Sequence, residues 1–193
     1  ETVVEGLEIP WGMAFLPDNS ILITEKKGEL IHVKNGEKKK VEGLPEIYAY
    51  GQGGLLDIEL DPDYVKNGWI YLSFSSNLEK DEKGGNTTIM RAKLSNDKLV
   101  NSEILYKATP NTKSGAHFGS RLEFDRNGFL YFSIGDRLKR DENPQDISRD
   151  GGKIYRINAD GSIPIDNPFY NEKGAKQAIY SYGHRNPQGM ALN

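Results

Sequence analysis

His117 and Asp136 are the two residues whose types and positions could support acid–base chemistry. His117 lies in a run of mostly small residues, Ser114–Gly119, and small side chains let a ligand or another backbone approach closely. A turn at Asp125–Gly128 joins two apolar runs, and the second run ends at Asp136. If the runs pair as a hairpin, the two side chains meet at one edge of a sheet. The sequence therefore predicts a base and a carboxylate that orients it, although a surface histidine and a turn aspartate would give the same pattern.

The composition is that of a globular, turn-rich chain. Its 193 residues include 21 Gly and 9 Pro, and 36% are hydrophobic and 27% charged. This length is enough for one domain with its own core, and no apolar run approaches the roughly 20 residues that a membrane span needs. The net charge of −3 argues against a nucleic-acid surface. The absence of cysteine excludes disulfides, thiol catalysis and Cys-ligated zinc, and it leaves the compartment open.

A pattern of glycine, strand, turn, strand, loop and strand recurs along the chain. It occupies residues 9–33, 54–94 and 119–158, and a fourth copy begins at Gly189 and stops at Asn193. The number of residues between the start of the first copy and the start of the second suits a four-stranded propeller blade. The longer intervals between the later copies suit blades with inserted loops. No amphipathic helix of three turns is predicted anywhere. We therefore expect an all-β fold.

Repeats that bury their faces only against neighbouring repeats favour a β-propeller. A β-sandwich also has short strands with regular turns, and it is the alternative. Three repeats and the start of a fourth do not close a ring of typically about 4–8 blades. We expect residues 1–193 to form a single, incomplete propeller domain, the N-terminal half of a ring that a C-terminal half or a second copy closes. Apolar runs such as Ile21–Ile23 and Trp69–Leu72 would then lie on uncovered blade faces.

Polar side chains gather in the loop that precedes the first strand of each repeat. The first strand of a propeller blade is normally the innermost, so equivalent loops converge on one end of the central channel. We predict a shared pocket at that end, built from Gln52, His117, Arg185, Asn186 and Gln188.

At these residues the chain resembles the soluble quinoprotein sugar dehydrogenases, which comprise the aldose sugar dehydrogenases and the related soluble glucose dehydrogenase. The matching segments are Ile9–Pro17, Gly51–Asp57, His117–Leu122, Ile134–Asp136, Gly152–Pro168 and Gly183–Gly189. They follow the family order along the whole chain, and together they are far more specific than any one alone. The resemblance implies a six-bladed propeller that binds pyrroloquinoline quinone at the mouth of its channel. It also implies oxidation of the C1 hydroxyl of aldose sugars to lactones, with calcium assisting cofactor binding.

The resemblance assigns roles residue by residue. It implies that His117 is the general base, that Asp136 is its orienting carboxylate, and that Gln52, Arg185 and Asn186 contact the quinone. No metal ligand is implied in residues 1–193, because the family's calcium ligands and further basic cofactor ligands belong to its C-terminal half.

Two positions depart from the glucose enzyme's pattern. Ala116 precedes the histidine where that enzyme has a carboxamide or an acid, which puts the sugar contacts there in doubt. A glutamine that follows the Ile-Gly-Asp motif has no clear counterpart. Asp141 falls near its spacing, and Gln145 is a candidate replacement. Gln188 is ambiguous between the pocket wall and a turn.

Other histidines and a cationic neighbour have plainer interpretations. His184 is expected to be a packed histidine, and His32 a strand-surface residue with no partner. A structural ion pair is the alternative role for Arg185. Hydride removal from C1 needs a base near its working pKa, which a histidine supplies, and donors such as Arg185 and Asn186 would stabilise charge on a quinone oxygen.

Two other functions compete with sugar oxidation. One is a non-enzymatic propeller that binds protein or carbohydrate, and the other is a calcium-dependent lactonase, whose converging metal ligands the inserted loops do not supply. Retention of both His117 and Asp136 favours the enzyme. The expected partners are an aldose and an external electron acceptor, with no nucleic acid and no membrane span. The resemblance implies a secreted or periplasmic protein; no signal peptide is expected in this segment, and residues 1–193 alone are expected to be inactive.

Overall fold

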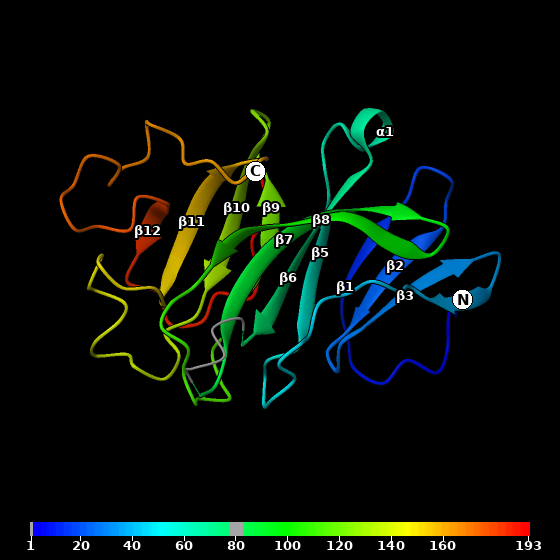
Figure 1. Cartoon of the computed structure of the whole chain (residues 1–193), viewed down its shortest axis with the longest axis horizontal. Coiled ribbons are helices and arrows are strands. Elements are labelled where there is room, and N and C mark those ends of the chain that lie inside the picture. Colours follow the sequence, from blue (N-terminus) through cyan, green and yellow to red (C-terminus); the bar gives the residue numbers. More distant parts are fainter. Residues whose placement is uncertain (1, 78–82) are drawn as a thin grey trace.

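The computed structural model describes residues 2–77 and 83–193, which form three four-stranded antiparallel sheets (Figure 1). The first sheet contains β1 (Pro10–Phe15), β2 (Ile21–Glu25), β3 (Glu29–Lys34) and β4 (Glu37–Lys40). The second contains β5 (Leu55–Leu60), β6 (Trp69–Ser76), β7 (Asn86–Ser95) and β8 (Lys98–Lys107). The third contains β9 (Leu122–Phe124), β10 (Phe129–Ile134), β11 (Lys153–Asn158) and β12 (Ile179–Tyr182). Within the described ranges the only helix is the single turn α1 (Tyr64–Asn67).

Each sheet is a meander whose strands are hydrogen-bonded in chain order, and the three sheets stand side by side as blades (Figure 1). The first strands of neighbouring blades are tied together. The carboxylate of Asp57 on β5 accepts hydrogen bonds from Arg121 Nη1 (2.9 Å) and from the backbone N–H of Leu122 at the start of β9 (2.8 Å). The predicted all-β propeller architecture is confirmed, and the described chain supplies three blades of it.

The cores lie between the blades, which is why the middle blade is buried on both faces. Successive side chains of a strand point to opposite faces. On β6, Ile70 and Leu72 pack against the first blade, whereas Tyr71 between them packs against the third. All three side chains have 0% exposed surface. The expectation that Trp69–Leu72 lies on an uncovered face is therefore wrong, because this run belongs to the blade that has two neighbours.

The outward face of the first blade is partly covered by the chain's own N-terminal segment. Ile23 on β2 is 5% exposed and packs with Val4 and Leu7, so Ile21–Ile23 is not an uncovered run either. Met13 and Phe15 on β1 are the side chains that remain exposed there, at 61% and 63%. Alternation along β1 places Ala14, which is buried in the core with the second blade, on the opposite face.

The sequence pattern contains three strands per repeat, and the structure adds a fourth to each blade. β4 contains the basic cluster Lys38–Lys40, and β12 contains Tyr180–Tyr182. Residues 183–193 contain no strand, although the sequence predicts the first strand of a fourth repeat at Gly189. A strand needs a hydrogen-bonding neighbour, and this segment instead leans on the third blade, where Ser133 Oγ donates to the Pro187 carbonyl (2.8 Å).

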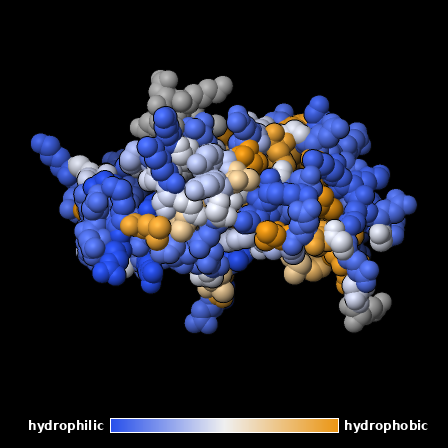
Figure 2. Space-filling view, turned by 90° about the horizontal axis from the view of Figure 1, so that it is seen from below, coloured by the Kyte–Doolittle hydropathy of each residue, from blue (hydrophilic) through white to orange (hydrophobic). Residues whose placement is uncertain are grey.

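The two ends of the blades differ. The short turns between the first and second strands, together with α1, lie at the upper end in Figure 1, and the longer loops that precede β5 and β9 lie at the lower end. Figure 2 looks onto the lower end and shows a surface that is mostly hydrophilic, with apolar side chains in separate patches. No helix in the described part of the chain is long and apolar enough to cross a membrane.

Candidate active site

The β9–β10 hairpin brings His117 and Asp136 together at the lower end of the third blade, as the sequence predicts. His117 Nδ1 lies 2.7 Å from Asp136 Oδ1. The same carboxylate oxygen accepts a hydrogen bond from the backbone N–H of Leu138 (2.8 Å). The side chain of Asp136 is 1% exposed and that of His117 is 14% exposed. A buried, immobilised carboxylate of this kind fixes the orientation of the imidazole ring.

The backbone of His117 is held in the left-handed region, at φ +58°. This region is uncommon for residues other than glycine and persists only where the surroundings impose it. Here the Gln52 side chain imposes it, because its Oε1 accepts a hydrogen bond from the His117 backbone N–H (2.8 Å). The sequence correctly brings Gln52 to this end of the blades, and the structure shows that it contacts the backbone of the histidine.

The second ring nitrogen of His117 is available for chemistry. Because the Asp136 carboxylate accepts a hydrogen bond from Nδ1–H, the lone pair of the neutral ring lies on Nε2. Nε2 has no hydrogen-bond partner among residues 2–77 and 83–193. The pair is therefore arranged to accept a proton at one atom, Nε2 of His117.

Two amide side chains near the histidine present their donor groups. Asn186 Oδ1 accepts from the backbone N–H of Gly119 (3.0 Å), as Gln52 Oε1 accepts from His117. With both oxygens occupied, the NH2 groups of Gln52 and Asn186 are the groups left to bind a ligand, and each carries two N–H donors. The two NH2 groups therefore offer hydrogen-bond donors to a ligand beside His117.

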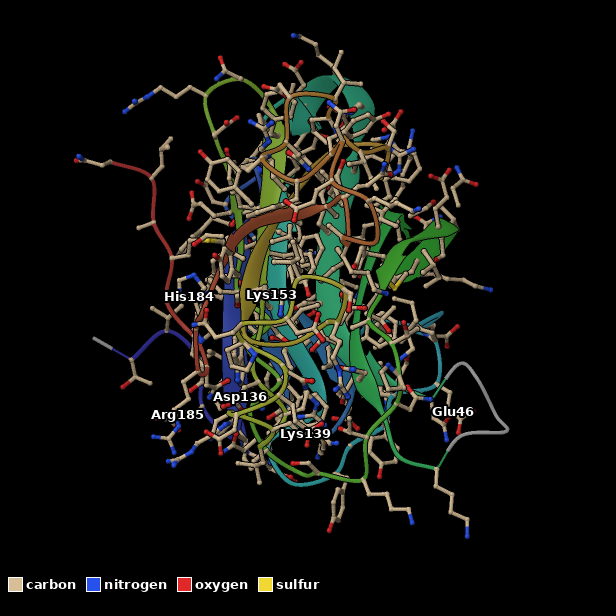
Figure 3. All side chains as sticks on the ribbon, turned by 90° about the vertical axis from the view of Figure 1, so that its left-hand side faces the viewer. Glu46, Asp136, Lys139, Lys153, His184 and Arg185 are labelled. Carbon is tan, nitrogen blue, oxygen red and sulfur yellow. The ribbon has the colours of Figure 1, made fainter. Side chains whose placement is uncertain are left out.

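Arg185 lies beside the pair and keeps its charge unpaired. Its backbone carbonyl accepts a hydrogen bond from the Asp136 N–H (2.7 Å), and its side chain is exposed. No ion pair joins its guanidinium to any residue of the described chain. Figure 3 shows Arg185 and Asp136 close together at the same end of the molecule, with Lys139 near them. The structural ion pair that is the alternative for Arg185 is not formed.

Glycine makes the contact between the loops of the second and third blades. The Gln52 N–H donates to the Gly115 carbonyl (2.6 Å), and a Cβ placed on Gly51 would lie 2.2 Å from that carbonyl oxygen. Gly51 also has φ +62°. Only glycine tolerates both the conformation and the approach, and the contact is what brings Gln52 against His117.

Arg137 is the functional candidate that the sequence pattern misses. It is 1% exposed, it stacks on the Phe118 ring at 3.4 Å, and its guanidinium donates to the carbonyls of Ser114 (2.6 Å), Gly85 (3.3 Å) and Ala116. Burial lowers the pKa of Arg137 to about 10, and the neighbouring Asp136 carboxylate opposes that shift. Through its hydrogen bonds to the Ser114 and Ala116 carbonyls, Arg137 fixes the loop that carries His117. Its place directly after Asp136 is the only signal in the sequence.

Two predicted pocket residues lie at this end without touching the pair. Gln188 is exposed, and only its backbone carbonyl is engaged, by Arg121 Nε (3.0 Å). Gln145 is exposed beside Gly183, whose built Cβ would lie 3.1 Å from Gln145 Nε2. The exposed Asp141 pairs with its neighbour Arg140. The structure does not bring these three side chains to His117.

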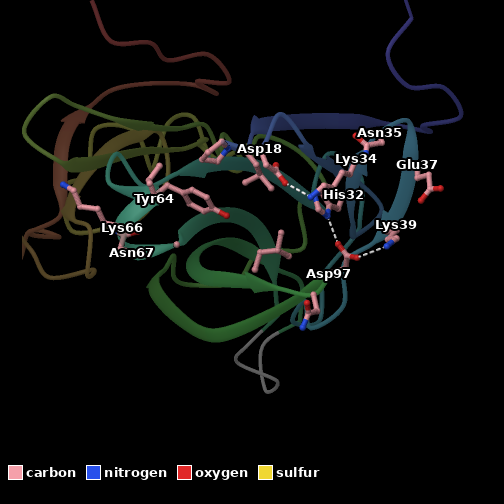
Figure 4. A pocket seen from close by; sticks show the side chains of 16 residues that line it. Asp18, His32, Lys34, Asn35, Glu37, Lys39, Tyr64, Lys66, Asn67 and Asp97 are labelled. Carbon is pink, nitrogen blue, oxygen red and sulfur yellow. Dashed lines mark hydrogen bonds and ion pairs between the residues drawn. The ribbon is translucent and has the colours of Figure 1, made fainter.

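The remaining histidines are both bound, and one prediction about them is wrong. His184 Nε2 lies 2.9 Å from Ser181 Oγ, and burial lowers its pKa, as befits the packed histidine that was predicted. His32 does have partners, since its Nδ1 lies 2.5 Å from Asp97 Oδ1 (Figure 4) and its Nε2 lies 2.9 Å from Ser20 Oγ. Asp97 comes from the next blade, so the sequence around His32 does not reveal it.

The comparisons with known proteins agree with the fold. The family model for glucose / sorbosone dehydrogenases matches residues 7–193, and the chain belongs to that family. It is 42% identical over 198 residues to the aldose sugar dehydrogenase YliI of Escherichia coli, covering 100% of this chain and 53% of that protein. It is 33% identical over 220 residues to quinoprotein glucose dehydrogenase B of Acinetobacter calcoaceticus, covering 100% of this chain and 45% of that protein.

A solved structure extends the comparison to a cofactor complex. The PQQ-bound aldose sugar dehydrogenase of Streptomyces coelicolor superposes with a TM-score of 0.80 at 32% identity, over 96% of this chain and 54% of that one. The chain thus spans about half the length of the relatives that it matches. Within the described residues, no three His, Asp or Glu side chains gather to hold a metal ion.

Proposed function

We propose that this chain carries the general base of a quinoprotein that oxidises the C1 hydroxyl of aldose sugars to lactones with pyrroloquinoline quinone. The observation that carries the proposal is the His117–Asp136 pair, with its 2.7 Å contact and a free Nε2 beside three unpaired donor side chains. A protein that only bound a ligand would have no need of a histidine held in this way.

The residues present suit the cofactor. Pyrroloquinoline quinone is flat and carries carboxylate groups beside its quinone oxygens, so it needs donors and positive charge. The guanidinium of Arg185 and the NH2 groups of Gln52 and Asn186 provide both, because their other polar atoms are already bound within the protein. These three side chains would hold the quinone, and calcium, bound by ligands outside this chain, would assist.

The chain's own part in the reaction is a proton transfer. When bound, the quinone supplies the acceptor for the hydride from C1. His117 Nε2 takes the proton from the C1 hydroxyl, and the Asp136 carboxylate stabilises the imidazolium that forms. Gln52 and Arg137 keep the loop in place during the transfer, since one binds the His117 N–H and the other the Ser114 and Ala116 carbonyls.

The setting of the protein follows from the same proposal. We expect an extracytoplasmic enzyme that passes electrons to an external acceptor. We expect residues 1–193 alone to be inactive, because a C-terminal half or a second copy is needed to close the ring and to add the remaining cofactor ligands. The exposed Met13 and Phe15 on the outward face of the first blade suit such a closing contact.

The test is reconstitution of the full-length protein with pyrroloquinoline quinone and calcium, followed by dye reduction with glucose and other aldoses. Arg185→Ala should weaken quinone affinity and turnover together, because the cation contacts the cofactor before and during the reaction. Lys66→Gln, at the opposite end of the blades, is the matched control and should change neither. A protein that neither binds the quinone nor reduces the dye would contradict the proposal.

A further inference from the structure

A cavity of about 410 Å³ lies behind the loop that carries His117, between the second and third blades. Its walls come from the stretch around Thr112 and Lys113 and from the β10–β11 loop, including Lys139 and Arg149. Lys139 is visible beside Asp136 in Figure 3. The cavity borders the His117 loop through Ser114 and Arg137, and its ligand would not take part in the proposed sugar oxidation.

The cavity is strongly cationic. Four of its lining side chains are basic, namely Lys113, Arg137, Lys139 and Arg149. Lys139 and Arg149 share a single carboxylate, Glu142, at 3.0 and 3.2 Å. Lys113 forms no ion pair within the described ranges, and Arg137 binds only carbonyl oxygens. Among residues 2–77 and 83–193, the positive charge of the lining therefore exceeds what the neighbouring carboxylates neutralise.

The one carboxylate in the lining is already committed elsewhere. Asp150 Oδ1 accepts from the hydroxyls of Tyr106 (2.7 Å) and Tyr155 (2.9 Å). Its Oδ2 accepts from the Thr109 N–H (2.9 Å) and pairs with Lys176 (3.1 Å). Of these four donors only Lys176 is a cation, and it lies outside the cavity lining, so the negative charge of Asp150 is already paired there.

Buried donors without partners mark the same place. Across the described chain, three buried side-chain atoms lack a hydrogen-bond partner, and two of them, Arg137 Nε and Thr112 Oγ1, belong to residues that line this cavity. Buried polar groups are nearly always satisfied, and an exception calls for a ligand or a solvent partner. A guanidinium N–H and a hydroxyl, with lysines around them, match an oxyanion that has several acceptor oxygens.

We propose that this cavity binds the phosphate group of a small ligand, either inorganic phosphate or a sugar phosphate. A tetrahedral dianion can meet the cations of both walls at once. The volume exceeds that of a single phosphate and falls within the range of small-molecule sites, which leaves room for a short carbon skeleton.

The test is calorimetric titration of the protein with inorganic phosphate and, separately, with glucose 6-phosphate, at constant ionic strength set with chloride. Saturable binding of either ligand is expected. Affinity should fall by about 10²-fold in the double variant Lys113→Gln/Arg149→Gln, because each of its two lost charged contacts is worth roughly a factor of 10. Arg149→Lys keeps the charge and should retain most of the affinity, and Lys66→Gln at the far end should bind as the parent does.

The two ligands separate the two sources. Equal affinity assigns the site to phosphate itself, and tighter binding of glucose 6-phosphate assigns it to a sugar phosphate. Amide chemical shifts that move at residues 112–114 and 137–150 would support either assignment. The proposal is overturned if neither ligand saturates at millimolar concentration, or if the Lys66→Gln control loses as much affinity as the cavity variants.

Discussion

Two histidine–carboxylate pairs lie at opposite ends of the blades, and the distances between the ring nitrogen and the carboxylate oxygen are similar in the two pairs. His117 Nδ1 is 2.7 Å from Asp136, and His32 Nδ1 is 2.5 Å from Asp97. Both histidines are mostly buried, with 14% and 12% of their side chains exposed. A search for such pairs alone would rank them equally.

The second ring nitrogen separates them. His32 Nε2 lies 2.9 Å from Ser20 Oγ, and that hydroxyl donates to Asp18 (2.5 Å). Serine, histidine and aspartate thus lie in the order of a hydrolytic triad, but Ser20 is 2% exposed and its proton is already given to Asp18. His32 links β3 of the first blade to the β7–β8 turn of the second. His32 therefore joins two blades, whereas the second ring nitrogen of His117 has no partner within the described residues.

The largest expected effect breaks the comparison at the histidines. His117→Ala should lower sugar oxidation by the quinone-loaded, full-length protein by at least about 10²-fold, because it removes the proton acceptor. Quinone binding should be little changed. His32→Ala is the matched variant and should leave kcat unaltered. Equal turnover in His117→Ala and the parent would remove His117 from the mechanism.

The two carboxylates sharpen the same contrast. In Asp136→Asn, an amide that donates to Nδ1 would place the ring proton on Nε2, the atom that must accept one, and kcat should again fall by about 10²-fold or more. Asp97→Asn should leave kcat unchanged. A pH–rate profile for each variant checks this, since an Asp136→Asn enzyme with the parent's profile and rate would contradict the assigned tautomer.

Arg137 should have an intermediate effect. Arg137→Met removes the donors to the Ser114 and Ala116 carbonyls, and a small displacement of the histidine loop should lower kcat on the order of 10- to 10²-fold with KM less affected. Arg137→Lys keeps the charge but loses the planar fork, so it should recover only part of the rate. If kcat is retained while only the melting temperature falls, Arg137 is structural and does not position the base.

The pair at the other end should matter for stability alone. His32→Ala removes the partly buried contact with Asp97, which joins two blades, and the hydrogen bond with Ser20 inside the first blade, and we expect a loss of about 1 kcal/mol in the free energy of unfolding. Denaturant unfolding measures it. Lys34→Ala, which breaks an exposed pair with Asp18, is the control and should cost less. A free energy of unfolding that His32→Ala leaves unchanged would show that the His32–Asp97 contact contributes nothing to stability.

The last prediction concerns a pH dependence of stability that arises from Glu59 and from neither histidine. Burial raises the pKa of Glu59 on β5 to about 7, and the nearby Glu123 and Asp57 carboxylates add to the shift. The folded state then holds this proton more tightly than the unfolded state does, so Glu59 contributes stability that is complete below about pH 4.5 and is lost as pH rises towards about 7. Glu59→Gln should flatten the stability curve over that interval. An unaltered slope would contradict the shift.

The sequence predicts those parts of the molecule in which neighbours along the chain are neighbours in space. The hairpin turn at Asp125–Gly128 places His117 opposite Asp136, and equivalent loops bring Gln52 and Asn186 to the same end. The fourth strand of the first blade escapes notice because β4 is exposed along its whole length and has no alternation of apolar residues.

Contacts between blades are the other part that a sequence cannot supply. The partner of His32 belongs to a different repeat, and the carbonyls that Arg137 binds come from Gly85 as well as from the histidine loop. Neither has a spacing that a local pattern could detect. Gly189 resembles an opening strand, yet a strand forms only where a second one pairs with it.

The position of His117 is set by groups from separate blades: Gln52 enters from the loop before the second, and Asp136 from the third. Loosening one blade against another would misplace the imidazole before any sheet lost its own hydrogen bonds. Heating is therefore expected to abolish the proposed activity at a lower temperature than the one at which the circular dichroism of the protein changes. The temperature limit of activity would then be set by the motion of one blade relative to another. Substitutions that stabilise the contacts between blades, rather than the strands within a blade, would raise that limit.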